Sequence, residues 1–215
     1  MSVHLRPEEI EAESFRIIEA EVGPHPWSLL EWPVVRRVIH TSADFDYART
    51  LVFSAGAVPA GLEALRAGRP LVTDTTMALA GINKAGLARF GVATACFVAD
   101  PEVARQARET GVTRSLLAMR RGAAENPGGI FIIGNAPTAL FELVRLVREE
   151  GVRPALVVAL PVGFVGAAES KEALVALEAE CPGVAFITSR GRKGGSNVAA
   201  AVVNALLRLA EEGTV

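Results

Sequence analysis

The amino-acid sequence predicts an α/β fold: a doubly wound, mostly parallel sheet flanked by helices, with an N-terminal helical extension. Short apolar runs alternate with Ala- and Leu-rich amphipathic stretches from residue 51 onward. Several of these runs are apolar on both faces, as are the strands of a covered parallel sheet. The chain has 215 residues, half of them hydrophobic, which is typical of a single domain.

The apolar runs give the expected strands, at residues 51–53, 71–73, 93–98, 129–133, 155–160 and 184–188. The helices expected between them cover residues 57–67, 101–110, 138–150, 170–180 and 196–212. Pro101 and Pro137 suit the first turns of helices, while Gly68, Gly111 and Gly151 suit helix ends. The order of these elements predicts repeated βαβ units.

The first 48 residues have a different pattern and are expected to form a helical extension packed on a single domain that spans residues 1–215. Residues 7–21 predict one helix. Residues 28–40 predict a second, although Pro33 could kink or restart it. Such helices could cap the sheet or reach another subunit.

Charge and composition argue against several classes of partner. Lys and Arg number 22 against 24 Asp and Glu, so the net charge of -2 gives no general attraction to nucleic acid or to a membrane surface. No apolar run reaches membrane-spanning length, and the acidic start of the chain is not typical of a targeting peptide. Cys96 and Cys181 are expected to be buried, reduced thiols of a cytoplasmic protein.

Ligands of open parallel sheets bind beyond the carboxyl ends of the strands, so the residues that follow each strand are candidates for a site. These segments, at 73–77, 134–138, 161–166 and 188–197, are rich in Gly, hydroxyls, Asn and cations, and poor in His and Cys. The composition suits a large ligand with anionic arms and predicts no metal held by side chains. In the last segment, three cations and three glycines precede a helix, which favours an anion, although a solvated basic turn would look the same.

Residues 36–46 form the densest polar segment, with two guanidiniums, an imidazole, two hydroxyls and two carboxylates. Histidine is the side chain best able to give or take a proton near neutrality. A lone histidine is more often structural, but the polar neighbours of His40 favour a function. His4 and His25 lack such neighbours and are interpreted as tail and turn residues.

Six segments of the chain resemble the signature stretches of the precorrin-8X and cobalt-precorrin-8 methylmutase family, in the family's order and spacing. They are residues 14–18 (SFRII), 37–45 (RVIHTSADF), 73–77 (TDTTM), 134–140 (GNAPTAL), 161–171 (PVGFVGAAESK) and 191–196 (GRKGGS). The resemblance implies that a methyl group migrates from carbon eleven to carbon twelve of a corrin macrocycle. The product would be hydrogenobyrinic acid, or cobyrinic acid where the substrate carries cobalt. The resemblance also implies a homodimer with each pocket near the subunit interface. It further implies that His40 is the acid and that Ser14 and Arg37 contact the substrate.

The residues agree with this chemistry. A methyl shift within one molecule needs no redox cofactor, nucleophile or methyl donor, so one positioned acid suffices and we expect no cofactor beyond cobalt carried by the substrate. The cations Arg37, Arg114, Arg190, Arg192 and Lys193 could bind the substrate's carboxylates. Further donors and apolar contacts are expected from Ser14, Thr41, Thr75, Thr76 and Asn135, and from Met77, Val162 and Phe164.

Several of these residues have an ordinary structural alternative. Arg114 could be a surface cation, Thr75 and Thr76 helix caps, and Met77 and Phe164 core residues. Asp44 and Asp46 could orient His40 or Thr41, or only cap a turn; Asp44 could also raise the pKa of His40.

Two other functions remain open at this point: a non-catalytic corrinoid carrier that passes its ligand to neighbouring corrin-pathway enzymes, and an enzyme acting on a phosphorylated metabolite.

Overall fold

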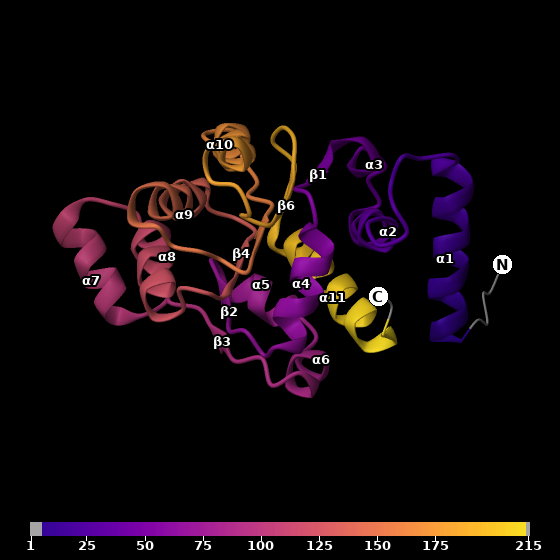
Figure 1. The fold of residues 1–215 in the computed structure, drawn as a ribbon, viewed down its shortest axis with the longest axis horizontal. Coiled ribbons are helices and arrows are strands. Elements are labelled where there is room, and N and C mark those ends of the chain that lie inside the picture. The colour runs from indigo at the N-terminus through magenta and orange to yellow at the C-terminus, as the bar shows by residue number, and fades with distance from the viewer. Residues whose placement is uncertain (1–5, 214–215) are drawn as a thin grey trace.

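The computed structural model describes residues 6–213, so His4 lies outside the described residues. Six strands form one sheet: β1 (Leu51–Phe53), β2 (Leu71–Thr73), β3 (Thr94–Ala95), β4 (Ile130–Ile133), β5 (Leu156–Ala159) and β6 (Phe186–Ser189). Their order is β1-β6-β5-β4-β2-β3, and all neighbours are parallel except β1, which runs antiparallel to β6. The predicted α/β fold class is confirmed (Figure 1).

Helices connect and flank the strands. They are α1 (Pro7–Val22), α2 (Trp32–Ser42), α3 (Tyr47–Thr50), α4 (Ala57–Arg66), α5 (Thr76–Gly81), α6 (Lys84–Arg89), α7 (Pro101–Thr110), α8 (Arg114–Glu125), α9 (Pro137–Glu150), α10 (Ala167–Glu180) and α11 (Ser196–Glu212). The five helices predicted after residue 51 are present, whereas α3, α5, α6 and α8 lie outside the predicted helix ranges.

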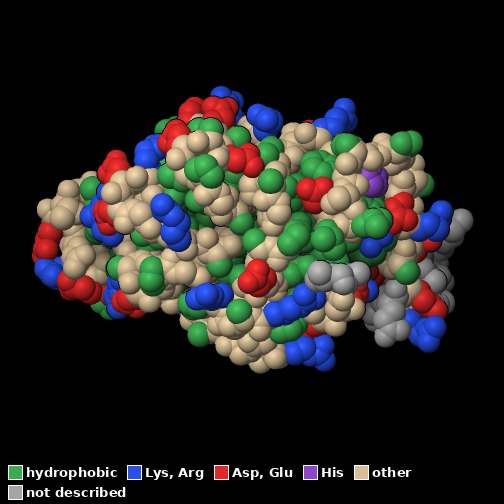
Figure 2. Space-filling view, in the orientation of Figure 1, with side chains coloured by type: hydrophobic (Ala, Val, Ile, Leu, Met, Phe, Trp, Pro, Cys, Tyr) green, Lys and Arg blue, Asp and Glu red, His purple; other side chains and the backbone are tan. Residues whose placement is uncertain are grey.

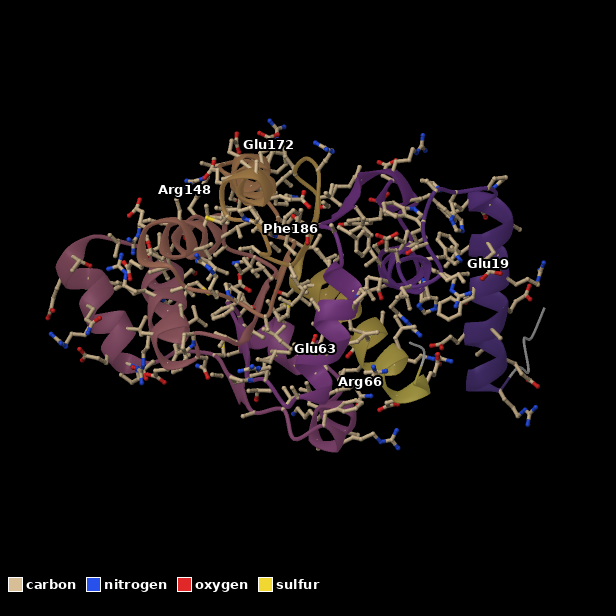
Figure 3. The ribbon with its side chains drawn as sticks, viewed as in Figure 1. Glu19, Glu63, Arg66, Arg148, Glu172 and Phe186 are labelled. Atoms are coloured by element: carbon tan, nitrogen blue, oxygen red, sulfur yellow. The ribbon has the colours of Figure 1, made fainter. Side chains whose placement is uncertain are left out.

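The core lies on both faces of the sheet because alternate residues of each strand point to opposite sides. Ile130 and Ile132 belong to an apolar cluster with α4 and α11, while Phe131 and Ile133 belong to a second cluster with α8, α9 and α10. Phe186 is fully buried in this second cluster and lies near the centre of the molecule (Figure 3).

The N-terminal helices share the first of these clusters. Val34, Val35, Val38 and Ile39 of α2 are buried there with residues of α11, which fixes the orientation of α2. The helix begins at Trp32 and not at the predicted residue 28, because Pro33 lacks an N–H and is suited to a first turn. Figure 1 shows α1 outside α2, at one end of the molecule.

Two further predicted elements differ from the structure by three residues at one end. Only Thr94 and Ala95 of the predicted strand 93–98 pair with β2, because Phe97 and Val98 pack instead against α7 and α8. Helix α10 begins at Ala167, three residues before the predicted start, directly after Gly166 in the left-handed region. Cys96 and Cys181 are free and only half-buried, so the prediction of full burial was wrong.

The outer surface carries charges of both signs, which are interspersed over the face in Figure 2. Among residues 6–213, no helix combines the length and the apolar character needed to span a membrane.

Gly134 lets the end of β4 approach the start of α11. A Cβ atom at this position would lie 2.6 Å from the Cα atom of Ser196 and 3.0 Å from its nitrogen. We expect Gly134→Ala to lower the free energy of unfolding by about 1–3 kcal/mol, because backbone atoms must move apart. Urea unfolding measures this. Gly128→Ala is the control, since its added methyl meets only the end of the Arg69 side chain at 3.5 Å; equal stability of the two variants would contradict the expectation.

Candidate functional site

His40 lies in the last turn of α2, half-buried and facing α1. Its ring meets the edge of the Phe15 ring, with 5.3 Å between the ring centroids and an interplanar angle of 66°. Because the opposite face of α2 is buried, the backbone that carries His40 is fixed. The imidazole therefore has a defined position next to an aromatic ring.

Phe15 also contacts two cations of α2. The guanidinium carbons of Arg36 and Arg37 lie 4.2 and 4.8 Å from the Phe15 ring centroid, within the range of cation–π attraction. The sequence-predicted residues Arg37 and His40 thus meet on one aromatic ring, which belongs to the residue directly after Ser14. The Ser14 hydroxyl donates to the carbonyl of Ile10 at 2.8 Å.

Arg37 is held by a carboxylate on α1. Its two terminal nitrogens donate to the two oxygens of Glu11 at 2.8 and 3.1 Å, and Arg208 of α11 donates to Glu11 at 2.7 Å. The hydrogen bonds from Arg37 lower the pKa of Glu11 to about 2, and Arg208 adds to this effect. Glu11 therefore stays ionised at neutral pH and balances part of the charge of the two arginines.

The turn after α2 is tied to the loop after β6. Lys193 donates to Asp44 Oδ2 and to Asp46 Oδ2, both at 2.6 Å. The hydrogen bond from Lys193 lowers the pKa of Asp44, and the same contacts raise the pKa of Lys193. Asp44 Oδ1 also accepts from the backbone N–H of Asp46, so it caps the turn as one alternative predicted. Among the described residues, Asp44 makes no hydrogen bond or ion pair with His40, and the Thr41 side chain is exposed.

A second group of predicted residues lies at the carboxyl edge of the sheet. Thr75 caps α5 by accepting from the backbone of Ala78, and its hydroxyl is 2.9 Å from the Ser196 hydroxyl at the start of α11. Thr76 is the first residue of α5 and is exposed, as is Asn135 in the loop after β4. The capping role of Thr75 is confirmed, and these residues surround the ends of β2 and β4.

The buried residue Asp74 organises this edge, and the sequence analysis did not single it out. It is 1% exposed, and its carboxylate accepts backbone N–H groups from Gly134, Asn135 and Ala136 at 2.8–2.9 Å. Burial raises the pKa of Asp74, and the three N–H donors oppose that effect. Asp74 thereby locks the loop after β2 to the loop after β4.

The predicted cation Arg114 lies apart from His40. Arg114 is the exposed first residue of α8, where the Thr113 and Thr138 hydroxyls, 2.9 Å apart, join the starts of α8 and α9. Figure 1 shows α8 and α1 toward opposite ends of the long axis. Arg190 follows β6, where its backbone N–H donates to the Thr50 carbonyl while its side chain is exposed.

Comparison with known proteins identifies the family. Residues 9–209 match the family profile described as precorrin-8X methylmutase. The chain belongs to the precorrin-8X methylmutase family. It is 46% identical to a cobalt-precorrin-8 methylmutase of Priestia megaterium, with 97% of this chain and 91% of the relative covered. It is 50% identical to a cobalt-precorrin-8 methylmutase of Salmonella typhimurium, with 94% and 95% covered.

A solved structure agrees with this assignment. The crystal structure of precorrin-8X methylmutase from Thermus thermophilus superposes with a TM-score of 0.85 at 44% identity, covering 96% of this chain and 99% of that chain. The predicted family is therefore confirmed. The family's name describes an isomerase that shifts a methyl group.

Three apolar residues that the sequence predicted as ligand contacts are exposed in this member of the family. Met77, Val162 and Phe164 are 71%, 42% and 85% exposed, so the core alternative for Met77 and Phe164 is wrong. The guanidinium carbon of Arg192 lies 5.6 Å from the Phe164 ring centroid. These side chains follow β2 and β5 and leave apolar surface near the carboxyl edge of the sheet.

Asp74 offers a direct test of the edge geometry. We expect Asp74→Asn to lower the free energy of unfolding by about 2–4 kcal/mol, because an amide cannot accept all three N–H groups without burying unpaired donors. Urea unfolding followed by circular dichroism measures the change. Asp100→Asn is the matched control: Asp100 caps α7 through Glu102 and Val103, and Asn caps helices about as well. Similar losses in the two variants would contradict the special role of Asp74.

Proposed function

We propose that this chain catalyses the methyl shift from carbon eleven to carbon twelve of precorrin-8X or its cobalt form, with His40 as the general acid. The product is then hydrogenobyrinic or cobyrinic acid, intermediates of cobalamin biosynthesis. The proposal depends above all on the placement of His40, whose ring lies against Phe15 on a helix with a buried opposite face. Membership of the family supports the reaction class.

In this mechanism His40 protonates the conjugated ligand and makes the end point of the migration poorer in electrons. The methyl group moves with its bonding electrons within one molecule, so the reaction needs no resident cofactor. The rest of the catalysis comes from holding the macrocycle in one geometry. The fixed backbone of α2 supports this positioning role.

Arg37 is well placed to bind a substrate carboxylate next to His40. Only two of its N–H groups are directed to Glu11, and a guanidinium has five. Glu11 therefore orients Arg37 while leaving donors for the ligand. Arg37 and the Ser14 hydroxyl are the proposed contacts on the helical extension.

The remaining proposed substrate contacts lie in two other regions. Thr41 and Lys193 lie near the end of α2, and Thr75, Thr76, Asn135, Arg114 and Arg190 lie along the sheet edge and at the start of α8. We propose a homodimer in which the substrate lies between subunits. The separation of α8 from α1 and the exposed side chains of Met77 and Phe164 support this arrangement (Figure 1). We further propose a cytoplasmic location, which the free cysteines favour.

His40→Ala tests the acid. We expect kcat to fall by about 10²–10⁴-fold while the affinity for hydrogenobyrinic acid, titrated by visible absorbance, changes little. His25→Ala is the control, because His25 stacks on Trp32 with 3.9 Å between ring centroids and has no proposed catalytic role. Full turnover by His40→Ala would exclude the acid role. Tight binding without turnover in the unmodified protein would favour a corrinoid carrier.

Mixed dimers test the shared site. His40→Ala and Arg114→Ala homodimers should both be impaired. A purified heterodimer of the two variants should recover about half of the unmodified activity, because one of its two sites takes both intact side chains from different subunits. Differently tagged subunits allow this heterodimer to be isolated. A heterodimer as inactive as its parents would place His40 and Arg114 in the same subunit's site.

A further inference from the structure

Lys171 of α10 is a buried cation with no carboxylate partner among the ion pairs of the described residues. Its side chain is 1% exposed, and its ammonium donates to the Ser189 hydroxyl at 3.2 Å and to the Lys193 carbonyl at 2.8 Å. Burial lowers the pKa of Lys171 to about 8. Burying an ammonium with only neutral acceptors costs stability, which an apolar side chain of similar length would avoid. The cost points to a role other than stability.

The ammonium fixes the backbone of the loop after β6. The Lys193 carbonyl accepts from Lys171 and also from the Ser189 hydroxyl at 3.2 Å. On the other side of the loop, the backbone N–H of Gly195 donates to the Leu160 carbonyl at 2.9 Å. At Gly194 an added Cβ would lie 2.2 Å from the same carbonyl oxygen, so the loop packs directly on the end of β5. The main chain around Lys193 is therefore fixed on one side by Lys171 and on the other by the packing of Gly194 and Gly195 on Leu160.

The side chain of Lys193 connects this fixed loop to the turn that follows α2, the helix that bears His40. Its ammonium bridges Asp44 and Asp46, which would otherwise repel each other, at 2.6 Å from each. Asp44 directly follows Ala43, which ends α2 in the left-handed region at φ 52° and donates to the Ile39 carbonyl. The contacts thus run from α10 through one loop to the last turn of α2.

We propose that Lys171 is a positioning residue for His40, acting through the main chain of Lys193 and the bridge from Lys193 to Asp44 and Asp46. This inference rests on the proposed acid role of His40. The bridge is exposed and adds little to stability, but it joins the helical extension to the sheet at one point next to the acid. A displacement of about 1 Å at such a group can lower a rate by about 100-fold.

Three single variants and one control test the proposal. Lys171→Met keeps the length of the stem and removes the ammonium. Lys193→Met removes the bridge, and Asp44→Asn removes one of its charges while keeping the turn. Ser170→Ala is the matched control, because Ser170 is equally buried on α10 but its hydroxyl, among residues 6–213, bonds only the Ala167 carbonyl of its own helix. A second control, Glu172→Gln, removes a charge from the outer side of α10 (Figure 3).

Two readouts separate positioning from general damage. The first compares kcat with the affinity for hydrogenobyrinic acid. The second follows the His40 imidazole by NMR in histidine-labelled protein, where only three histidines contribute signals. We expect Lys171→Met to lower kcat by about 10–100-fold with product affinity within about threefold, and to shift the His40 signal as Asp44→Asn does. The double variant Lys171→Met, Asp44→Asn should be no worse than the poorer single variant, because both break one chain of contacts.

The controls should keep the rate and the His40 signal of the unmodified protein. A folded Lys171→Met protein with an unchanged His40 signal and unchanged kcat would overturn the proposal, as would fully additive losses in the double variant. If Lys171→Met does not fold, Lys193→Met decides in the same way, since its side chain is exposed. A loss confined to product affinity in Lys193→Met would assign Lys193 to substrate binding and overturn the proposal.

Absence of turnover in the unmodified protein would reject the proposed function, whereas the NMR comparison would still test the link to His40.

Discussion

The carboxylate of Asp74 closes the carboxyl edge of the sheet, and the loops around the site depend on it. It lies beneath the loop after β4 and accepts three backbone N–H groups that would otherwise be buried without partners. The same loop brings Gly134 against the start of α11, and Thr75 next to Asp74 bonds Ser196 there. A single buried charge thereby sets the relative positions of the ends of β2 and β4 and the first turn of α11.

Helix α11 links the sheet edge to the N-terminal helices that bear Arg37 and His40. Its apolar face packs against α2 in the same cluster that covers one side of the sheet, and its residue Arg208 bonds Glu11 of α1. Glu11 in turn orients Arg37, and α2 presents His40 to Phe15. Helix packing thus fixes the backbone that bears the proposed acid, while backbone hydrogen bonds position the proposed ligand donors at the sheet edge.

Much of the fold could be predicted from the sequence, because apolar runs and helix-breaking residues are local signals. The buried strand Ile130–Ile133 and the helix after Pro137 are examples. Asp74 and Lys171 could not be found in this way. Nothing local distinguishes Asp74 from an exposed loop carboxylate, and a lysine on a helix is normally exposed. Their roles depend on loops that are distant in sequence, which only the tertiary structure brings together.

The charges around His40 are largely balanced before any ligand binds. Glu11 faces Arg37 and Arg208, and Lys193 bridges Asp44 and Asp46. A substrate with many carboxylates therefore meets oriented donors and not a region of strong unpaired charge. Because Arg37, Arg208 and Lys193 already have fixed partners, binding needs little reordering of these side chains, and more of the binding energy can be used to hold the macrocycle in the geometry of the methyl shift.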